Sequence, residues 1–153
     1  VMTHLAISGT EDLGSGLVLI SVVVDIERIG DYTKNIYELA VNHPKKLKGF
    51  MFEDKLQDIE KNTRVLFNST IETFKNQNIE LARKIMEDYK KDISKQCDEI
   101  TNTIVSSKAD IEADSAAAVA LYARYLKRIS AHSRNLISSL VNPFERIGYP
   151  EEK

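Results

Sequence analysis

The sequence is short of the residues that interrupt helices and of those that build special sites. Its 153 residues include three prolines, six glycines, one cysteine and no tryptophan. Scarce proline and glycine favour long helices, because both residues interrupt them. The single cysteine, Cys97, excludes an internal disulfide framework and a zinc site made of several cysteines. We expect Cys97 to be a buried, inert thiol in a reducing compartment.

Charge and hydropathy exclude further classes of protein. A formal net charge of -2 leaves no basic field for nucleic acid. The longest apolar run, residues 17–24, has about eight residues, which is too short to span a bilayer. We therefore expect a cytoplasmic protein that is peripheral to a membrane at most. An initial Val1 in place of methionine is typical of a chain that is part of a longer polypeptide.

Apolar residues recur at three- and four-residue steps along most of the chain, which predicts an all-α protein of long antiparallel helices. The predicted helices cover residues 12–41, 50–75, 79–105 and 109–141. A chain of this length supports one domain over residues 1–153. The last ten residues, 144–153, follow Pro143 and are expected to be loosely held.

The most informative stretch is residues 17–39, where an apolar run passes directly into a cluster of charges. On a helical period, Glu27 and Asp31 fall on one stripe with Ile20 and Val24, so we expect both carboxylates to lie beside buried aliphatic side chains. Buried carboxylates need a cation, a hydrogen-bond network or a metal. The pattern leaves open whether Arg28 and its neighbours or a metal ion neutralises them.

At these residues the sequence resembles a known family. Residues 27–31, Glu-Arg-Ile-Gly-Asp, and the following Asn35-Ile36 resemble the ERIGD signature of PhoU-type regulators of phosphate uptake. The resemblance implies helical bundles whose paired acidic motifs on adjacent helices hold metal clusters. Asp88 and Asp92 resemble the second acidic motif, although a charged flank facing water explains them equally well. The candidate metal ligands are Glu27, Asp31, Asp88 and Asp92. Another chain, upstream residues, or a rearrangement that brings Asp88 and Asp92 to Glu27 and Asp31 would complete the ligand shell, and the last option gives hard oxygen ligands suited to iron, manganese, magnesium or calcium.

Residues 125–136 repeat residues 25–36, and residue n aligns with residue n + 100. The second copy keeps Arg128, Ile129 and Asn135, but it has Lys127 and Ala131 where the first copy has acids. PhoU chains resemble two tandem three-helix bundles, each ending in an ERIGD helix. On that template, the second to fourth predicted helices form one complete bundle, and the first helix belongs to a preceding, incomplete one.

The repeat also indicates what the charged residues do. Lys127 would face Asp88 and Asp92 and form an ion pair with them, together with Arg124 or Arg128, in place of a second metal cluster. Arg28 and Arg128 occur in both repeats and are interpreted as structural ion-pair formers. His132, which replaces Tyr32, is expected to be partly exposed.

We expect no enzymatic activity, because the chain has no recognisable nucleophile motif and no histidine with glutamate three residues before it, as di-iron proteins require. The favoured function is a PhoU-like regulator of phosphate uptake and signalling that acts as a metal-binding helical interaction module. The resemblance implies a phosphate transporter and a sensor kinase as partners. The alternative is a cytoplasmic PhoU-like scaffold domain of a sodium-phosphate cotransporter or another transporter. The apolar flank of helix 12–41 predicts a homodimer with that helix at or near the contact.

Overall fold

In the computed structural model, which describes residues 13–43, 45–88 and 93–151, every regular element is helical. The α-helices are α2 (Leu13–Asn42), α3 (Glu53–Asn76), α4 (Ile79–Asp88), α5 (Ile93–Val105) and α6 (Ala113–Ser138), and the short 3-10 turns are η2 (Phe50–Phe52) and η3 (Phe144–Arg146). The prediction of an all-α bundle is confirmed.

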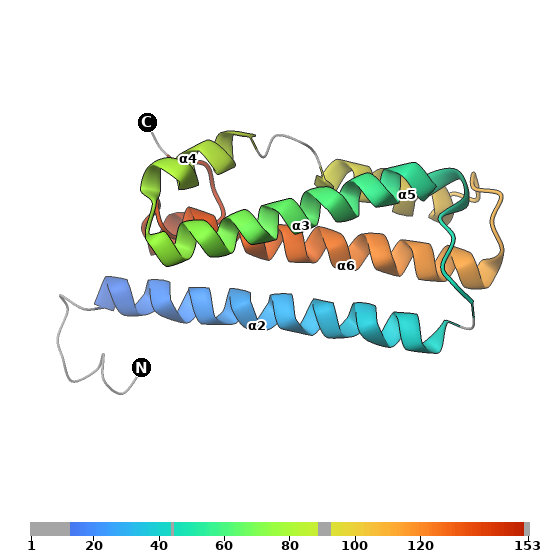
Figure 1. The fold of residues 1–153 in the computed structure, drawn as a ribbon, viewed down its shortest axis with the longest axis horizontal. Helices are drawn as coiled ribbons and strands as arrows, with labels where there is room; N and C mark the ends of the chain where they lie inside the picture. The colour runs from blue at the N-terminus through green and yellow to red at the C-terminus, as the bar shows by residue number, and fades with distance from the viewer. Residues whose placement is uncertain (1–12, 44, 89–92, 152–153) are drawn as a thin grey trace.

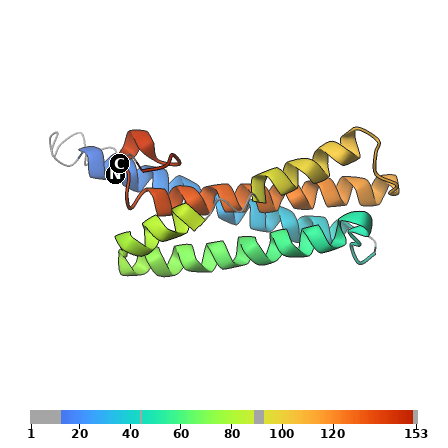
Figure 2. The ribbon, with the colours of Figure 1, turned by 90° about the horizontal axis from the view of Figure 1, so that it is seen from above.

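Helix α6 is the centre of the fold, because α2, α3, α4 and α5 all pack against it. Helix α2 runs antiparallel to α6 along one side, and α3 lies along another (Figure 1). Seen from above, α4 and α5 follow one another along the length of α3 and α6 (Figure 2). Helices α3 to α6 form the predicted bundle, and α2 lies outside it against α6.

The predicted helix 79–105 appears as two helices, α4 and α5, and residues 89–92 lie outside the described residues. Helix α6 begins at Ala113 instead of residue 109. The reason is local packing: Ala109 and Ile111 lie against the main core cluster, and the backbone at Glu112 is extended. The four-residue difference therefore reflects a tertiary contact that overrides helix propensity.

The main core lies between α3, α5 and α6. Its buried members are Phe52, Leu56, Ile59, Ile93, Cys97, Ile100, Val119, Ala123 and Leu126. Cys97 is 1% exposed, as expected of a buried thiol. A second cluster joins α2 to α6 through Val22, Ile29, Ile129 and Leu136. The fold thus places the two repeats, residues 25–36 and 125–136, on two helices in direct contact.

The expectation that the chain after Pro143 is loosely held is wrong for the described part of it. The side-chain amide of Asn142 donates to the carbonyl oxygens of Arg146 and Tyr149, at 3.1 and 2.8 Å. Arg83 of α4 forms a paired hydrogen bond with Glu151, whose nearest contact is 2.8 Å. These contacts fold the segment back onto the α4 end of the bundle.

Candidate functional site

The ERIGD residues of α2 divide into one buried and four exposed positions. Ile29 is 7% exposed and belongs to the α2–α6 core cluster. Glu27, Arg28, Gly30 and Asp31 are all exposed. Arg28 and Asp31 form an ion pair at 3.4 Å across one helical turn, with side chains 56% and 50% exposed. Such a pair contributes little stability in water, about 0.3–0.5 kcal/mol at most.

The prediction that Glu27 and Asp31 lie on the buried stripe of this helix is wrong. Val24, on the same stripe, is 45% exposed. The stripe that faces α6 is offset by one or two residues and consists of Val18, Val22, Asp25, Ile29, Tyr32 and Ile36. The first half of α2 is apolar on several sides, so periodicity alone did not determine which side meets α6.

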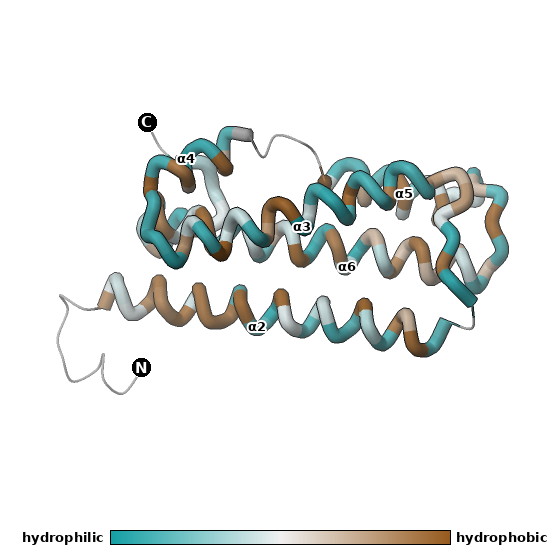
Figure 3. The backbone as a smooth tube through the Cα atoms, in the orientation of Figure 1, coloured by the Kyte–Doolittle hydropathy of each residue, from teal (hydrophilic) through white to brown (hydrophobic). Residues whose placement is uncertain are grey.

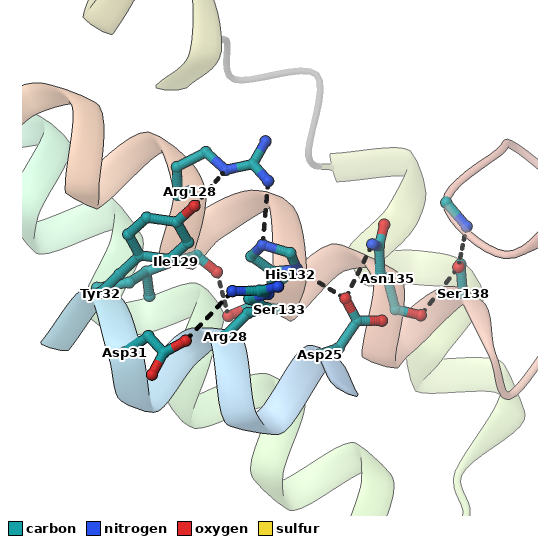
Figure 4. Close-up of polar contacts among 11 residues, drawn as sticks. Asp25, Arg28, Asp31, Tyr32, Arg128, Ile129, His132, Ser133, Asn135 and Ser138 are labelled. Carbon is teal, nitrogen blue, oxygen red and sulfur yellow. Dashed lines mark hydrogen bonds and ion pairs between the residues drawn. The ribbon is translucent and has the colours of Figure 1, made fainter. Parts of the chain in front are cut away.

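The acid that is buried is Asp25, which is 5% exposed. Its Oδ1 lies 2.7 Å from Nδ1 of His132, and the side-chain amide of Asn135 donates to the same oxygen at 3.1 Å (Figure 4). A buried carboxylate is costly without such partners. Two polar side chains of α6 therefore offset the desolvation of one acid of α2.

The other side of His132 contacts Arg128, whose Nη2 lies 3.3 Å from Nε2 of the ring. Arginine has only donors, so this contact requires Nε2 to accept, and the proton on the neutral ring then lies on Nδ1 and is donated to Asp25. Arg128 also donates from Nε to the Tyr32 hydroxyl at 3.2 Å (Figure 4). Its guanidinium carbon lies 5.6 Å from the centre of the Tyr32 ring, in a cation-π contact.

The two repeats face each other across this interface with approximate two-fold symmetry. Asp25 contacts His132, and Tyr32 lies against Tyr125 with ring centroids 6.2 Å apart. The repeat offset of 100 residues converts the first pair of positions into the second. Ile29 and Ile129, which are also equivalent, share one core cluster near the centre of the contact. Helices α2 and α6 therefore pack about a local pseudo-two-fold axis.

The polar network was missed by sequence reasoning, which did not single out Asp25 and expected His132 to be partly exposed without a role. A signal was present: Asp25 falls between Val22 and Ile29 on a seven-residue apolar repeat, and His132 is equivalent to Tyr32 on α6. An acid within an apolar stripe requires a partner on the helix that covers the stripe.

The predicted ion pair of Lys127 is present, but its described partner is different. Lys127 Nζ lies 2.6 Å from both carboxylate oxygens of Asp98 on α5. The prediction placed Lys127 opposite Asp88 and Asp92; Asp92 lies outside the described residues, as does the side chain of Asp88. Arg28 takes part in the expected ion pair with Asp31, whereas Arg128 contacts Tyr32 and His132.

Comparison with models of known protein families shows which family this chain belongs to. The family model of the PhoU domain matches residues 56–140, more than half of the chain. The chain belongs to the PhoU domain family. No curated protein and no solved structure matched it in the corresponding searches.

The PhoU match covers the bundle of α3 to α6, whereas the ERIGD residues of α2 lie before its first residue. The matched region thus contains the repeat copy that lacks both acids. PhoU domains are regulatory helical domains of phosphate uptake. Among the described residues, no helix combines the length and apolar character that crossing a membrane requires.

The described side chains do not by themselves fit a metal centre. Within residues 13–43, 45–88 and 93–151, no group of three or more histidine, cysteine or acidic side chains could hold an ion. Glu27 and Asp31 supply two carboxylates from one exposed helix face, and Asp31 is already paired with Arg28. Hard cations take about six oxygen ligands, so these two acids require further ligands from elsewhere.

Two other features bear on chemistry at the PhoU domain. Burial raises the pKa of the Cys97 thiol to about 12, so this group is not a nucleophile at neutral pH.

A cavity of about 540 Å³ lies between the end of α2, residues 43–49 and the start of α3. Lys45 and Lys46 line it together with Glu53 and Glu60, so its charges balance. The cavity therefore has no positive field that would select an anion.

Proposed function

We propose that this chain regulates phosphate uptake and phosphate signalling as a helical interaction module. It acts at the cytoplasmic side of a phosphate transporter and communicates with a sensor kinase. Membership of the PhoU domain family supports this assignment. We assign the binding of the partner to the exposed face of α2, where the side chains of Arg28 and Asp31 flank the buried Ile29.

Helix α2 has the geometry of a recognition element. Ile29 anchors the motif to α6, so the charges that flank it keep a fixed position on a rigid helix. Arg28 and Asp31 pair with each other at the exposed surface, and their loss would cost the fold little. Charged groups of this kind contribute orientation and association rate when a complementary partner docks.

Metal binding is a separate proposal. Glu27 and Asp31 would hold an ion only if another chain, or acids such as Asp88 and Asp92, completed the ligand set. A bound divalent or iron-type metal would supply a positive charge at the exposed face of α2. The interaction role proposed above does not depend on it.

The experiment that tests the function is complementation of a bacterial strain that lacks its own PhoU-type regulator. A reporter of the phosphate-starvation response is measured in phosphate-rich medium. We expect this chain to restore repression and the Arg28→Ala/Asp31→Ala variant to fail while folding normally. Lys61→Ala, an exposed position on α3, is the matched control. Equal repression by the double variant and the native chain would refute the proposed surface.

A further inference from the structure

The connection between α2 and α3 carries a compact positive cluster. Residues 45–48 read Lys-Lys-Leu-Lys, and we call residues 45–49 the link. Teal, hydrophilic residues mark the link in Figure 3, at the end of the bundle where α2 ends and α6 begins. All three lysines are exposed, and within the described residues none of their ammonium groups forms an ion pair. These charges are therefore available to a ligand.

A cavity of about 240 Å³ lies between the link and the start of α6. The three lysines of the link line it together with His43 and Phe50, and the opposite wall contains Glu112 and Ser115. The lining groups bring three positive charges and one negative charge. In the larger cavity of about 540 Å³, by contrast, two lysines meet two glutamates. The smaller cavity therefore has the positive field that the larger one lacks.

Contacts within the chain hold the link in place. Leu47, which lies between two of the lysines, packs against the main core cluster. The ring of His43 donates from Nδ1 to the backbone carbonyl oxygen of Lys45. A side-chain carbon at Gly49 would lie 2.7 Å from Cα of Glu53, so the close approach of the link to α3 requires glycine at this position. The lysines thus project from a backbone of fixed shape.

Phe50, which follows the link, has a strained backbone. Its φ is +51°, in the left-handed region that residues with a side chain rarely adopt. Its side chain is 44% exposed, so burial in the core does not account for this conformation. The same residue lines the smaller cavity beside the lysines. Strained residues of this kind are concentrated at ligand sites, which directs attention to the cavity.

The wall formed by α6 supplies hydrogen-bond donors. The helix begins at Ala113, and the side chain of Glu112 does not cap it, although the amide groups of a first turn have no partner within their own helix. Ser115 is 8% exposed and lines the cavity, and among the described residues its hydroxyl has no hydrogen-bond partner. Its amide donates to the carboxylate of Asp114 at 2.7 Å. A nearly buried hydroxyl without a partner is a donor for a ligand.

We propose that this cavity binds inorganic phosphate. The lysines supply positive charge from one wall, and the Ser115 hydroxyl and the first-turn amides of α6 donate from the other. A tetrahedral anion presents oxygens to both walls, whereas a planar carboxylate presents only two. The volume of about 240 Å³ is below the range of about 300–1,000 Å³ that larger organic ligands occupy, so it suits a small ion.

Glu112 determines which anion the cavity accepts. Its exposed carboxylate makes no cap hydrogen bond and faces the same cavity as the lysines. A carboxylate repels an anion unless that anion brings a proton that it can donate. Hydrogen phosphate has such an O–H group at neutral pH, whereas sulfate and the phosphodiester of a lipid headgroup have none. Glu112 therefore selects phosphate over sulfate and over an anionic membrane surface.

The proposed site is separate from the surface that we assign to the regulatory partner. All of its lining residues lie outside α2, and none belongs to the surface formed by Arg28 and Asp31. The site therefore does not depend on what covers α2. Phosphate binding is measured on this chain alone, without a transporter or kinase, so it can fail while the proposed regulatory function holds, and the reverse.

The test is isothermal titration calorimetry of the full 153-residue chain with sodium phosphate near neutral pH and at low ionic strength. We expect one phosphate per chain with a Kd below about 1 mM. Lys48 lines the smaller cavity but not the larger one, and Lys48→Ala should weaken binding about tenfold. Ser115→Ala should weaken it about fivefold. Lys61→Ala, at an exposed position on α3, is the control and should bind normally.

A second titration uses sulfate in place of phosphate. The native chain should bind phosphate at least about tenfold more tightly than sulfate. Glu112→Gln should bring the two affinities close together, because the amide group can donate to sulfate as well as accept from phosphate. Asp110→Asn, which removes an exposed acid just before α6 without changing the cavity lining, is the matched control. It should keep the native preference.

Vesicles of phosphatidylglycerol and phosphatidylcholine test the lipid source of the same chemistry. We expect the chain not to sediment with them. Circular dichroism of each variant verifies that the helices are intact, so that a lost affinity is assigned to the cavity and not to unfolding.

Four results would overturn the proposal. The first is no binding of phosphate at about 10 mM, and the second is equal affinity of the native chain for phosphate and sulfate. The third is an equal loss of affinity in Lys61→Ala and Lys48→Ala, which would show attraction by overall charge. The fourth is sedimentation with vesicles that requires Lys48, which would assign the lysines to a membrane surface.

Discussion

Tyr32 and His132, which occupy equivalent positions in the two repeats, stack against each other at the α2–α6 interface with ring centroids 5.9 Å apart. The same interface holds Asp25 against His132 at 2.7 Å. One helix therefore contributes an acid and a phenol, and the other a histidine and an arginine. The interface thus combines asymmetric polar chemistry with a nearly symmetric backbone arrangement.

The first prediction concerns the buried pair. We expect Asp25→Ala and His132→Ala each to lower the free energy of unfolding by about 2 kcal/mol, because each removes the strongest hydrogen bond of a buried polar partner, which keeps only its contact with Asn135 or Arg128. The double variant should lose clearly less than the sum, since it removes both members. Urea denaturation of the four proteins gives the coupling. Asp31→Asn, an exposed acid on the same helix, should change stability by under about 0.5 kcal/mol. Strict additivity would show that the pair does not interact.

The sequence predicts the buried face of α6 correctly but not that of α2. Every α6 position from Val119 to Leu136 with seam spacing that was expected to face inward is buried or partly buried, because four other helices pack against α6. Helix α2 has one main neighbour and is apolar on several sides in its first half. Two stripes of α2 are therefore apolar enough to face α6. The prediction that the stripe containing Glu27 and Asp31 does so is wrong.

The polar partners could not be predicted for a related reason. Asp25 and His132 are 107 residues apart, and their contact depends on the register between α2 and α6. That register follows from packing of Val22, Ile29, Ile129 and Leu136, which periodicity within one helix does not specify. Likewise, Lys127 was expected to need an acid, but its pairing with Asp98 follows from the position of α5. The chemical need was predictable, whereas the partner was not.

A second prediction uses the reactivity of Cys97. Because burial raises the pKa of its thiol to about 12, the folded protein should not react with a thiol reagent at about pH 8. The same reagent should modify one thiol per chain after unfolding in urea, where the pKa returns to its ordinary value. Rapid labelling without denaturant would mean that α5 opens from the core. The rate of labelling at intermediate urea concentrations would then report that opening.

A third prediction concerns acid. Hydrogen bonds from the Gly49 amide and Gln57 lower the pKa of Glu53, and those from Lys55 and Arg83 lower the pKa values of Glu99 and Glu151. A pKa that is lower in the folded state means that protonation weakens the fold. The stabilisation is present above the ordinary value of 4.5 and is lost as the pH falls through the lower folded values.

The measurement is the free energy of unfolding at about pH 7 and about pH 3.5 for the native chain and for the variant with glutamine at all three positions. We expect the variant to lose less stability between the two pH values than the native chain. The difference should be modest, because water screens the contacts of these carboxylates. An identical loss in both proteins would assign the acid sensitivity to other groups. Glu27→Gln, an exposed acid of α2, is the control.

The last prediction concerns metal at the ERIGD residues. Glu27 and Asp31 are exposed, they come from one helix, and Asp31 is paired with Arg28 at 3.4 Å. Two such carboxylates leave most positions around a hard cation to water, so binding by them alone should be weak and should not survive dialysis. Elemental analysis of the dialysed chain should therefore find less than one metal ion per chain, and the same for Glu27→Ala/Asp31→Ala. Stoichiometric metal that disappears in that variant would contradict this expectation. It would mean that acids beyond these two, from the chain or from a second copy, complete a site with them.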